Sequence, residues 1–319
     1  MEFLFAPMEG VTYAEFRRVH RERFPGIAEY YTPFLAPNPT GDFRKKFLRE
    51  LTVDRASGAR VIPQILANSA EAFLITADTL GELGFDEVNL NAGCPSGTVV
   101  GKHKGAGMLA DPAALDAFLE QIFSKGGMKI SVKTRMGYES TEEFAALMEI
   151  YRRYPLSRLI VHARDRKGQY KSVPDLAGFA ALAGGCPFPV TYNGDVFTPE
   201  ALQKVKAAAP WTQSVMLGRG LVEDPALVRL LSGGAPLSLS ELTDFHDALL
   251  AAYLGTGLSP NYAVERMKGI WYYIRYLFPE SKKERKQLLK GKTLEEYRTS
   301  ASRIFESCRF DPTAGFVQE

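Results

Sequence analysis

The chain has 319 residues, of which 45% are hydrophobic, and its formal net charge is +2. This is enough chain for a complete core, and it fits one α/β barrel of about 230 to 250 residues with a smaller domain. The mild charge does not by itself indicate a nucleic-acid partner. The three cysteines lie far apart without C-x-x-C spacing, which argues against a disulfide framework or a zinc site. The first residues lack the basic start of a signal peptide and no apolar run could span a bilayer, so we expect a cytoplasmic location.

Eight short apolar runs predict eight strands that alternate with amphipathic helices. Several runs are almost continuous valine, isoleucine and leucine, which is typical of parallel strands buried on both faces. In chain order the runs are residues 3–8, 27–34, 60–66, 86–93, 129–137, 158–164, 188–195 and 213–220.

Capping residues mark the starts of the helices between these runs. Asp111, followed by proline, begins one helix, and Ser140 with Glu143 forms a capping box for the next. Thr198 and Asp224 each precede a proline in the same way. Strands and helices that alternate in this manner predict a (β/α)₈ TIM barrel.

The barrel is predicted over residues 1–235, followed by a C-terminal α-helical domain over 236–319, where no convincing strand is found. An open doubly wound sheet is the alternative architecture, but no G-x-G-x-x-G follows the first strand. Within the helical domain, residues 265–292 are rich in lysine and arginine, with Trp271 and several tyrosines interleaved.

Polar residues stand at the ends of the predicted strands, where barrels of this type carry their chemistry. Polar groups inside apolar runs are costly unless they are hydrogen-bonded or bind a ligand. A ring of amides, cations and one imidazole therefore suits a polar, ring-shaped cofactor. In chain order these residues are Pro7, Met8, Gln64, Asn91, Lys133, Arg135, His162, Arg164, Asn193, Gly194, Asp195, Gly218 and Arg219.

Each of these residues also has a plain structural interpretation. Gln64 and Asn91, taken singly, would more often be buried amides with satisfied hydrogen bonds, and His162 would more often be structural. Lys133 differs because a lysine inside "ISVKTRMG" needs an anionic or carbonyl partner. The glycines after the last two strands suit either turns or a phosphate held by backbone N–H groups, to which Arg219 would add a clamp.

Cys94 lies in the stretch "NLNAGCPSGTVVGKHKGAGML", after the fourth predicted strand and before a glycine-rich loop. A free cysteine is often only a small buried hydrophobic residue, and this is what we expect of Cys186 and Cys308. Lys102 and Lys104 follow Cys94 closely in sequence, and cations lower a thiol pKa when they are also near in space. The thiol suits a nucleophile, a proton donor or a redox sensor.

This stretch resembles the signature of the tRNA-dihydrouridine synthases. The segments "APMEGVTYAEFRR", "PQILAN", "VKTRMG", "VHAR", "YNGDV" and "MLGRG" match motifs of that family in the same order, across the predicted barrel. The later segment "AVERMKGIWYYI" is more loosely similar to the basic helix of the family. The motifs are highly specific as a set.

The resemblance implies an FMN enzyme that reduces the C5–C6 double bond of a D-loop uridine in tRNA, with NADPH as reductant. Cys94 would be the general acid, Asn91 would position the uracil, and Pro7 and Met8 would lie against the flavin ring. The other flavin contacts, to its polar edge or its phosphate, would come from Gln64, Lys133, His162, Asn193, Gly194, Asp195, Gly218 and Arg219.

The chemistry matches these residue types, because reduction of uracil needs a hydride at C6, which a flavin supplies, and a proton at C5. A cation such as Lys133 would stabilise an anionic reduced flavin. Cys94, on a loop that closes over bound RNA, would supply the proton from the face opposite the flavin. Many relatives have a lysine where this chain has Gly97, so Lys102 or Lys104 is a candidate replacement.

The basic helical segment is the candidate docking surface for tRNA. A run of charge is usually only a solvated face, but a uridine buried in folded tRNA requires an enzyme that holds a large RNA and removes the base from its stack. The residues expected to contact tRNA are Lys102, Lys104, Arg135 and Arg164 in the barrel, and Arg266, Lys268, Arg275, Lys282, Lys283, Arg285 and Lys286 in the helical domain.

Three other interpretations stay open from the residues. One is an FMN barrel that acts on a free pyrimidine, like a dihydroorotate dehydrogenase, although a small substrate does not need the basic domain. The second is a non-catalytic RNA-binding or chaperone-like barrel. The third is a phosphate-binding lyase or aldolase that uses Lys133 as a Schiff base. We expect a monomer, while the modified uridine and the choice between NADPH and NADH are not decided by the sequence.

Overall fold

A computed structural model describes the chain except for residues 39–46, 49, 52–59, 126 and 316–319. Its Cα positions divide into two compact units that are interleaved along the sequence. The barrel unit consists of Met1–Pro7, Ala28–Asp195 and Gln203–Leu217. The helical unit consists of Met8–Ile27, Val196–Leu202 and Gly218–Glu319. The predicted domain boundary at residue 235 stays a prediction.

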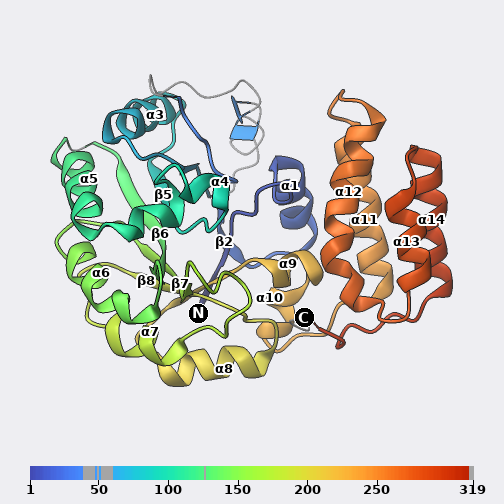
Figure 1. Ribbon diagram of the computed structural model, residues 1–319. Coiled ribbons are helices and arrows are strands. Elements are labelled where there is room, and N and C mark those ends of the chain that lie inside the picture. The colour runs from blue at the N-terminus through green and yellow to red at the C-terminus, as the bar shows by residue number, and fades with distance from the viewer. Residues whose placement is uncertain (39–46, 49, 52–59, 126, 316–319) are drawn as a thin grey trace. The chain divides into compact units, whose positions relative to one another are not determined.

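Nine parallel strands form one sheet in the barrel unit, in the order β3-β2-β1-β9-β8-β7-β6-β5-β4 (Figure 1). The two outermost strands, β3 (Val61–Ile62) and β4 (Gln64–Ile65), are halves of the third predicted run, interrupted at Pro63. Proline has no N–H to donate to a neighbouring strand. Because β3 pairs with β2 and β4 pairs with β5, this one segment closes the sheet into the predicted (β/α)₈ barrel.

Each of the eight predicted runs contains a strand. The remaining strands are β1 (Glu2–Phe5), β2 (Ile27–Tyr31), β5 (Glu87–Ala92), β6 (Lys129–Gly137), β7 (Leu159–Asp165), β8 (Val190–Asn193) and β9 (Ser214–Leu217). Helices alternate with the strands. They are α3 (Ala70–Glu82), α4 (Gly97–Val100), η1 (Gly105–Ala110), α5 (Pro112–Ser124), η2 (Thr141–Glu143), α6 (Phe144–Tyr151), α7 (Leu176–Leu182) and α8 (Pro199–Ala208). Of these, α3, α5, α6 and α7 lie on the outside of the sheet (Figure 1).

The predicted caps are largely confirmed. The Asp111 carboxylate accepts from the Ala114 N–H at 3.0 Å at the start of α5, and the Ser140–Glu143 capping box is present before α6. The helix expected to begin at Asp224 begins later, as α10 (Leu227–Leu231). The reason is that Asp224 Oδ1 accepts from the Ala226 N–H at 2.8 Å, which closes a turn before the helix.

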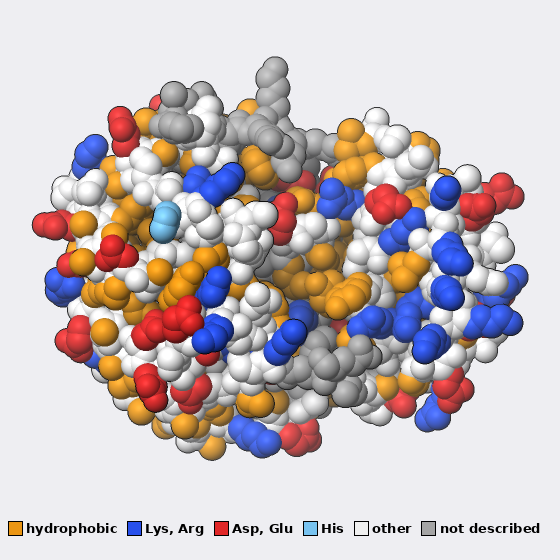
Figure 2. Space-filling view, viewed as in Figure 1, with side chains coloured by type: hydrophobic (Ala, Val, Ile, Leu, Met, Phe, Trp, Pro, Cys, Tyr) orange, Lys and Arg blue, Asp and Glu red, His pale blue; other side chains and the backbone are white. Residues whose placement is uncertain are grey.

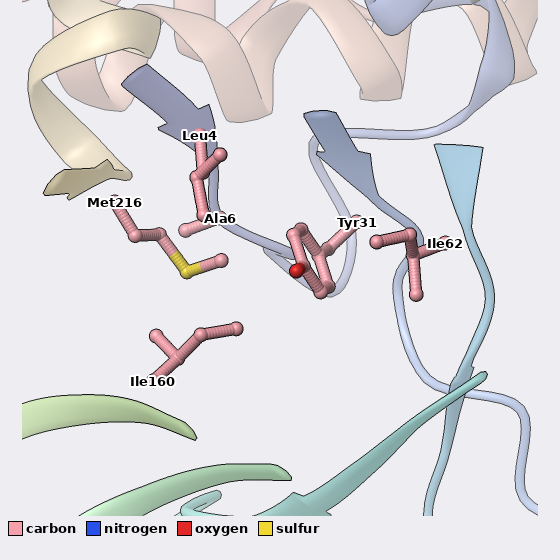
Figure 3. Packing of buried hydrophobic residues seen from close by; sticks show 6 residues of the cluster. All are labelled: Leu4, Ala6, Tyr31, Ile62, Ile160 and Met216. Carbon is pink, nitrogen blue, oxygen red and sulfur yellow. The ribbon is translucent and has the colours of Figure 1, made fainter. Parts of the chain in front are cut away.

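The interior of the barrel is filled by apolar side chains from strands that are far apart in sequence. Figure 3 shows six of them pointing toward one another: Leu4, Ala6, Tyr31, Ile62, Ile160 and Met216. Strand side chains alternate in direction, so interior positions recur every second residue. The same parity continues toward the C-terminal ends of the strands, where the interior residues become polar.

The N-terminal end of the barrel is closed by charged side chains that the sequence analysis did not identify. Arg60 donates from Nε to Glu29 Oε1 at 3.1 Å and from a terminal nitrogen to Glu87 Oε2 at 2.6 Å. Arg158 lies 3.6 Å from the same Glu29 carboxylate and donates to Thr191 Oγ1 at 3.1 Å. Because this is the end opposite the catalytic face of such barrels, we interpret the network as stabilising.

After β9 the described part of the chain contains helices and no strand, which confirms the helical C-terminal prediction. The helical unit also includes α1, which follows β1 in sequence and packs on α11 through Phe16 and Phe245, with ring centroids 5.5 Å apart. None of the described helices combines the length and apolar character needed to cross a membrane. The helices are α1 (Ala14–Arg23), α9 (Arg219–Glu223), α10, α11 (Leu239–Leu254), α12 (Pro260–Ile274), η3 (Arg275–Leu277), α13 (Lys282–Lys290) and α14 (Leu294–Ser307).

Candidate active site

A chain of side-chain amides connects β4, β5 and β6 at the C-terminal end of the barrel interior. Asn91 donates from Nδ2 to Gln64 Oε1 at 2.7 Å, and Gln64 donates from Nε2 to Asn89 Oδ1 at 2.7 Å. Asn89 in turn donates to Ser131 Oγ at 3.0 Å. The sequence analysis named Gln64 and Asn91 but missed their partners. A signal was present, because Asn89 lies two residues before Asn91 on the same strand face and Ser131 two before Lys133.

Lys133 on β6 extends this polar layer toward β8. Its ammonium donates to Asn193 Oδ1 at 3.0 Å, and Asn193 donates from Nδ2 to the Met216 carbonyl at 2.8 Å. Burial, helped by the neighbouring Arg135 charge, lowers the pKa of Lys133 to about 7. Within the described chain, Asn193 is the one side chain that accepts a hydrogen bond from this ammonium. An ammonium has three hydrogens to donate, so Lys133 can also donate to a ligand.

Asn91 also fixes the loop that carries the thiol. Its Oδ1 accepts from the backbone N–H groups of Gly93 at 3.1 Å and Cys94 at 2.9 Å. The Cys94 carbonyl accepts from the Ala106 N–H at 3.0 Å, which ties the start of the loop to η1. Cys94 is partly exposed rather than buried in the apolar core. The loop therefore places the thiol beside the amide layer.

Arg135 is buried and holds two loops together. It donates from Nε to the Gly93 carbonyl at 2.8 Å and from a terminal nitrogen to the carbonyls of Asp165 and Gln169 at 2.9 and 2.8 Å. Its guanidinium carbon lies 5.3 Å from the centre of the Tyr170 ring. Arg135 thus connects the loop of Cys94 to the loop that follows β7.

Tyr170 is a residue of this site that the sequence analysis missed. Its ring packs on His162, with centroids 5.6 Å apart, while 46% of the residue stays exposed. Tyr170 lies beyond the end of β7, in a turn where Gln169 has a φ of 51°, so the pattern of polar strand ends could not reveal it.

His162, Arg164 and Asp195 form a second polar group, next to Tyr170. Arg164 forms a two-point ion pair with Asp195 and contacts His162 Nε2 at 3.0 Å from a terminal nitrogen. Because a guanidinium can only donate, His162 Nε2 accepts this bond and Nδ1 carries the ring hydrogen. Arg164 is fully buried, so its charge is stabilised by Asp195 and not by solvent.

The lysines after Cys94 lie on the loop between α4 and η1. Lys102 is exposed and its carbonyl accepts from Asn68 Nδ2 at 2.9 Å, while Lys104 is half-buried. Burial and the charge of Lys102 lower the pKa of Lys104. Gly97, the first residue of α4, is exposed, and a Cβ at this position would meet no atom within 4 Å.

The remaining predicted cofactor residues are divided between the units. Pro7 ends the first segment of the barrel unit and Gly194 is buried at the end of β8, with a φ of 159°. Met8, Gly218 and Arg219 belong to the helical unit. There Met8 donates from its N–H to Thr12 Oγ1 at 2.8 Å, Gly218 precedes α9, and the Arg219 guanidinium lies 5.8 Å from the Phe197 ring centre.

The three predicted tRNA contacts on α12 and η3 have different surroundings. Arg266 lies between the rings of Tyr13 and Tyr262, 4.5 and 4.8 Å from their centres, and donates to the Gly10 carbonyl at 3.0 Å. Lys268 forms an ion pair with the exposed Glu265 at 2.8 Å. Arg275 lies over two tyrosine rings. All three cations therefore have partners within the helical unit, and the side chain of Lys268 is only 13% exposed.

The other two cysteines correct one expectation. Cys186 and Cys308 were expected to be buried, but both are partly exposed, because each lies just after the end of a helix. Cys186 donates weakly to the Ala183 carbonyl at 3.4 Å. Over the described residues, no group of three potential metal ligands is found.

A family model described as "Dihydrouridine synthase (Dus)" matches residues 4–250, which is more than half of the chain. This chain belongs to the dihydrouridine synthase family. The match spans the barrel and the whole amide layer with Cys94, so the polar strand ends lie within the part that the family shares. It also supports the resemblance found in the sequence over the interpretations as a free-pyrimidine dehydrogenase, a lyase or a non-catalytic barrel.

Curated relatives of this dihydrouridine synthase family member are similar at a modest level. One, from Shigella flexneri, is named "tRNA-dihydrouridine(16) synthase" and is 29% identical over 297 residues, covering 88% of this chain and 91% of its own length. A relative of the same name from Pseudomonas putida is 26% identical over 88% of this chain and 90% of its own length. "Probable tRNA-dihydrouridine synthase 2" of Bacillus subtilis is 28% identical over 70% of each chain.

A solved structure of a variant of NCR from Zymomonas mobilis is similar in fold to this chain, with a TM-score of 0.52. It covers 74% of this chain and 87% of its own, at 14% sequence identity. At this identity the likeness concerns the fold alone, and it agrees with the barrel observed here.

Proposed function

We propose that the chain reduces the C5–C6 double bond of a tRNA uridine to give 5,6-dihydrouridine, with FMN as cofactor and NADPH as reductant. The family match and the names of the relatives support tRNA uridine as the substrate. The observation that carries the chemistry is the contact between Asn91 Oδ1 and the Cys94 N–H, which holds a partly exposed thiol beside the amide layer.

The donor set at this end of the barrel fits FMN. Lys133 has one side-chain partner in the described chain and a pKa lowered to about 7, so an anionic or carbonyl ligand would offset the cost of its burial. Gln64 has a second amide hydrogen besides the one donated to Asn89. These groups suit the polar edge of an isoalloxazine. The proposed roles of Pro7, Met8, His162, Asn193, Gly194, Asp195, Gly218 and Arg219 as further FMN ligands rest on the resemblance.

When bound, FMN supplies the hydride for C6 of the uracil, with NADPH as the source of its electrons. The Cys94 thiol donates the proton to C5, which completes the addition of two hydrogens across the double bond. Asn91 holds the backbone of Cys94, and in our proposal its side chain also orients the uracil. Arg135, through the Gly93 carbonyl, keeps the thiol loop against the loop of Tyr170. Lys133 would hold the polar edge of the cofactor, and its positive charge would stabilise the negative charge of the reduced form.

Substitution of the thiol tests the catalytic proposal. The Cys94→Ala enzyme is expected to form dihydrouridine at least about 100-fold more slowly, because a general acid contributes about 10²–10⁴-fold. Its flavin absorbance and melting temperature should match those of the wild type. Cys186→Ala, a partly exposed cysteine outside the site, is the matched control. A Cys94→Ala enzyme that modifies tRNA at a near-normal rate would remove the thiol from the mechanism.

We further propose position 16 as the modified uridine. The two relatives named for this position align over 88% of the chain, so their similarity extends into the C-terminal helices. The Bacillus subtilis relative, whose name gives no position, aligns over 70%. Mapping dihydrouridine in tRNA from cells that lack this protein should show its loss at position 16 alone, and loss at another position would refute the assignment.

A further inference from the structure

Tyr272 is an exposed aromatic ring on a helix that buries most of its apolar side chains. Residues Met267, Ile270, Trp271 and Ile274 of α12 are buried, whereas Tyr272 is 56% exposed. Among the described residues of the helical unit, the other exposed large apolar side chains are Leu258 and Leu289. The ring is thus not part of a broad apolar patch.

A guanidinium stacks on this ring. The Arg275 guanidinium carbon lies 4.5 Å from the centre of the Tyr272 ring and 4.7 Å from that of Tyr276, and Arg275 donates to the Tyr276 hydroxyl at 2.6 Å. Tyr273 meets Tyr272 edge to face, with centroids 5.3 Å apart. Three aromatic rings and one planar cation therefore form a single cluster, which we call the Tyr272 platform: Tyr272, Tyr273, Arg275 and Tyr276.

The platform lies within the most basic segment of the chain. Residues 265–292 contain nine basic and three acidic residues, although the whole chain has a net charge of only +2. Lys282, Lys283 and Lys286 on α13 follow closely in sequence and are exposed. Figure 2 shows lysine and arginine side chains gathered over the C-terminal helices on the face in view. A ligand of this surface is expected to be a polyanion that also presents a flat ring.

We propose that the Tyr272 platform stacks an unpaired base of the tRNA substrate, at a site distinct from the uridine that is reduced. Loops and ends of folded RNA present unstacked bases, and aromatic side chains and arginine planes bind them face to face. A protein partner fits less well, because stable protein interfaces bury far more apolar surface than one ring supplies. This inference rests on the proposed function, since it assumes that the substrate is tRNA.

Binding of a tRNA transcript to the full chain tests the platform. Loss of one stacked base weakens binding by about 5- to 150-fold, so Tyr272→Ala should raise the dissociation constant by roughly 10-fold or more. Tyr272→Phe and Tyr272→Trp keep the ring and should bind within about 2-fold of the wild type. Arg275→Lys keeps the charge but loses the plane, and should bind more weakly. Leu289→Ala, an equally isolated exposed residue on α13, should have no effect.

Two further measurements separate stacking from charge. The slope of binding affinity against salt should be the same for Tyr272→Ala and wild type, because no phosphate contact is lost. Binding of heparin, a polyanion without bases, should also be unchanged.

Three results would overturn the inference. They are normal tRNA binding by Tyr272→Ala, a smaller salt dependence of tRNA binding in Tyr272→Ala than in wild type, or a loss of affinity in Tyr272→Phe as large as that in Tyr272→Ala. Failure of the wild-type chain to form dihydrouridine would instead reject the proposed function, which is measured separately.

Discussion

At the scale of single residues, Gly105 determines where Cys94 can lie. Its φ is +57°, a conformation that side chains other than glycine rarely adopt, and an added Cβ would lie 2.8 Å from the Cys94 carbonyl oxygen and 2.9 Å from the Cys94 Cβ. Any larger residue at position 105 would therefore both strain the backbone and displace Cys94, the proposed proton donor.

Gly105→Ala should reduce dihydrouridine formation at least about 10-fold and destabilise the fold by roughly 1–2 kcal/mol, the usual cost of a left-handed alanine. Gly97→Ala, at the start of α4 in the same segment between β5 and α5, is the matched control, since an added Cβ there meets nothing within 4 Å and should leave both properties unchanged. Initial rates and urea unfolding of the two variants decide the question. Equal activity in the two would show that the thiol tolerates displacement.

Lys133 predicts a pH dependence of stability in the flavin-free protein. Its pKa is about 7 in the folded state and about 10.4 when unfolded, so the unfolded chain binds more protons between these values. Stability therefore rises with pH from about 7 to 10, as the cost of a buried ammonium is removed. Lys133→Met should lack this contribution.

The measurement is the melting temperature of wild type and Lys133→Met between pH 7 and 10. Near pH 7 the variant should have the higher melting temperature. The difference between the two melting temperatures should become smaller as the pH rises. A difference that stays constant would place the ammonium in a well-solvated position and contradict the lowered pKa.

At the scale of elements, a buried polar cluster joins three helices of the helical unit. The Tyr297 hydroxyl on α14 accepts from Trp271 Nε1 on α12 at 2.9 Å and contacts His246 Nε2 on α11 at 2.7 Å. All three side chains are buried. Phe305 packs against both Trp271 and His246 and completes the cluster.

Tyr297→Phe should cost about 1–3 kcal/mol of unfolding free energy, because the Trp271 N–H and the His246 ring nitrogen lose a buried partner. Tyr272→Phe removes an exposed hydroxyl on a neighbouring helix and should change stability by less than about 0.5 kcal/mol. Chemical denaturation of both variants provides the comparison. If Tyr297→Phe changed the unfolding free energy as little as Tyr272→Phe, a water molecule would have replaced the lost Tyr297 hydroxyl.

The elements themselves were largely predictable from sequence, and the contacts between them were not. Continuous apolar runs located all eight strand segments, and the cap at Asp111 located a helix start. Pro63 split one run into β3 and β4, as expected for a residue without an N–H. The polar residues at the ends of the predicted strands gave Gln64 and Asn91. They could not give Tyr170, which reaches His162 from a turn whose conformation depends on tertiary contacts.

At the scale of the whole molecule, each compact unit is built from segments that are separated in the sequence. The helical unit takes in Met8–Ile27, which lies between β1 and β2 in sequence, as well as the C-terminal helices. Within that unit Phe16 and Phe24 of the N-terminal segment pack on Phe245 of α11, with ring centroids 5.5 and 5.7 Å apart. The C-terminal helices therefore share a hydrophobic core with residues encoded near the start of the chain.

Charge is also unevenly distributed over the chain. The net charge of +2 conceals a segment, residues 265–292, with nine basic and three acidic residues, so the rest of the chain is net negative. Such a distribution suits a protein that binds a polyanion over a limited surface. The total charge therefore hides a local excess of basic residues, and whether this segment contacts tRNA stays a prediction.

Replacing Lys282, Lys283 and Lys286 with glutamine tests whether this segment contacts tRNA phosphates. Each lost contact reduces the slope of log affinity against log salt by about 0.7 to 0.9, so the triple variant should lose about 2 to 3 from its slope. The same change at Lys125, Lys129 and Lys204, exposed lysines of the barrel unit, is the matched control and should leave the slope unchanged. Equal slopes for the triple variant and wild type would show that α13 is only a solvated face. Because Tyr272→Ala is expected to weaken binding without changing the slope, the two variants together separate phosphate contacts from base stacking on the same group of helices.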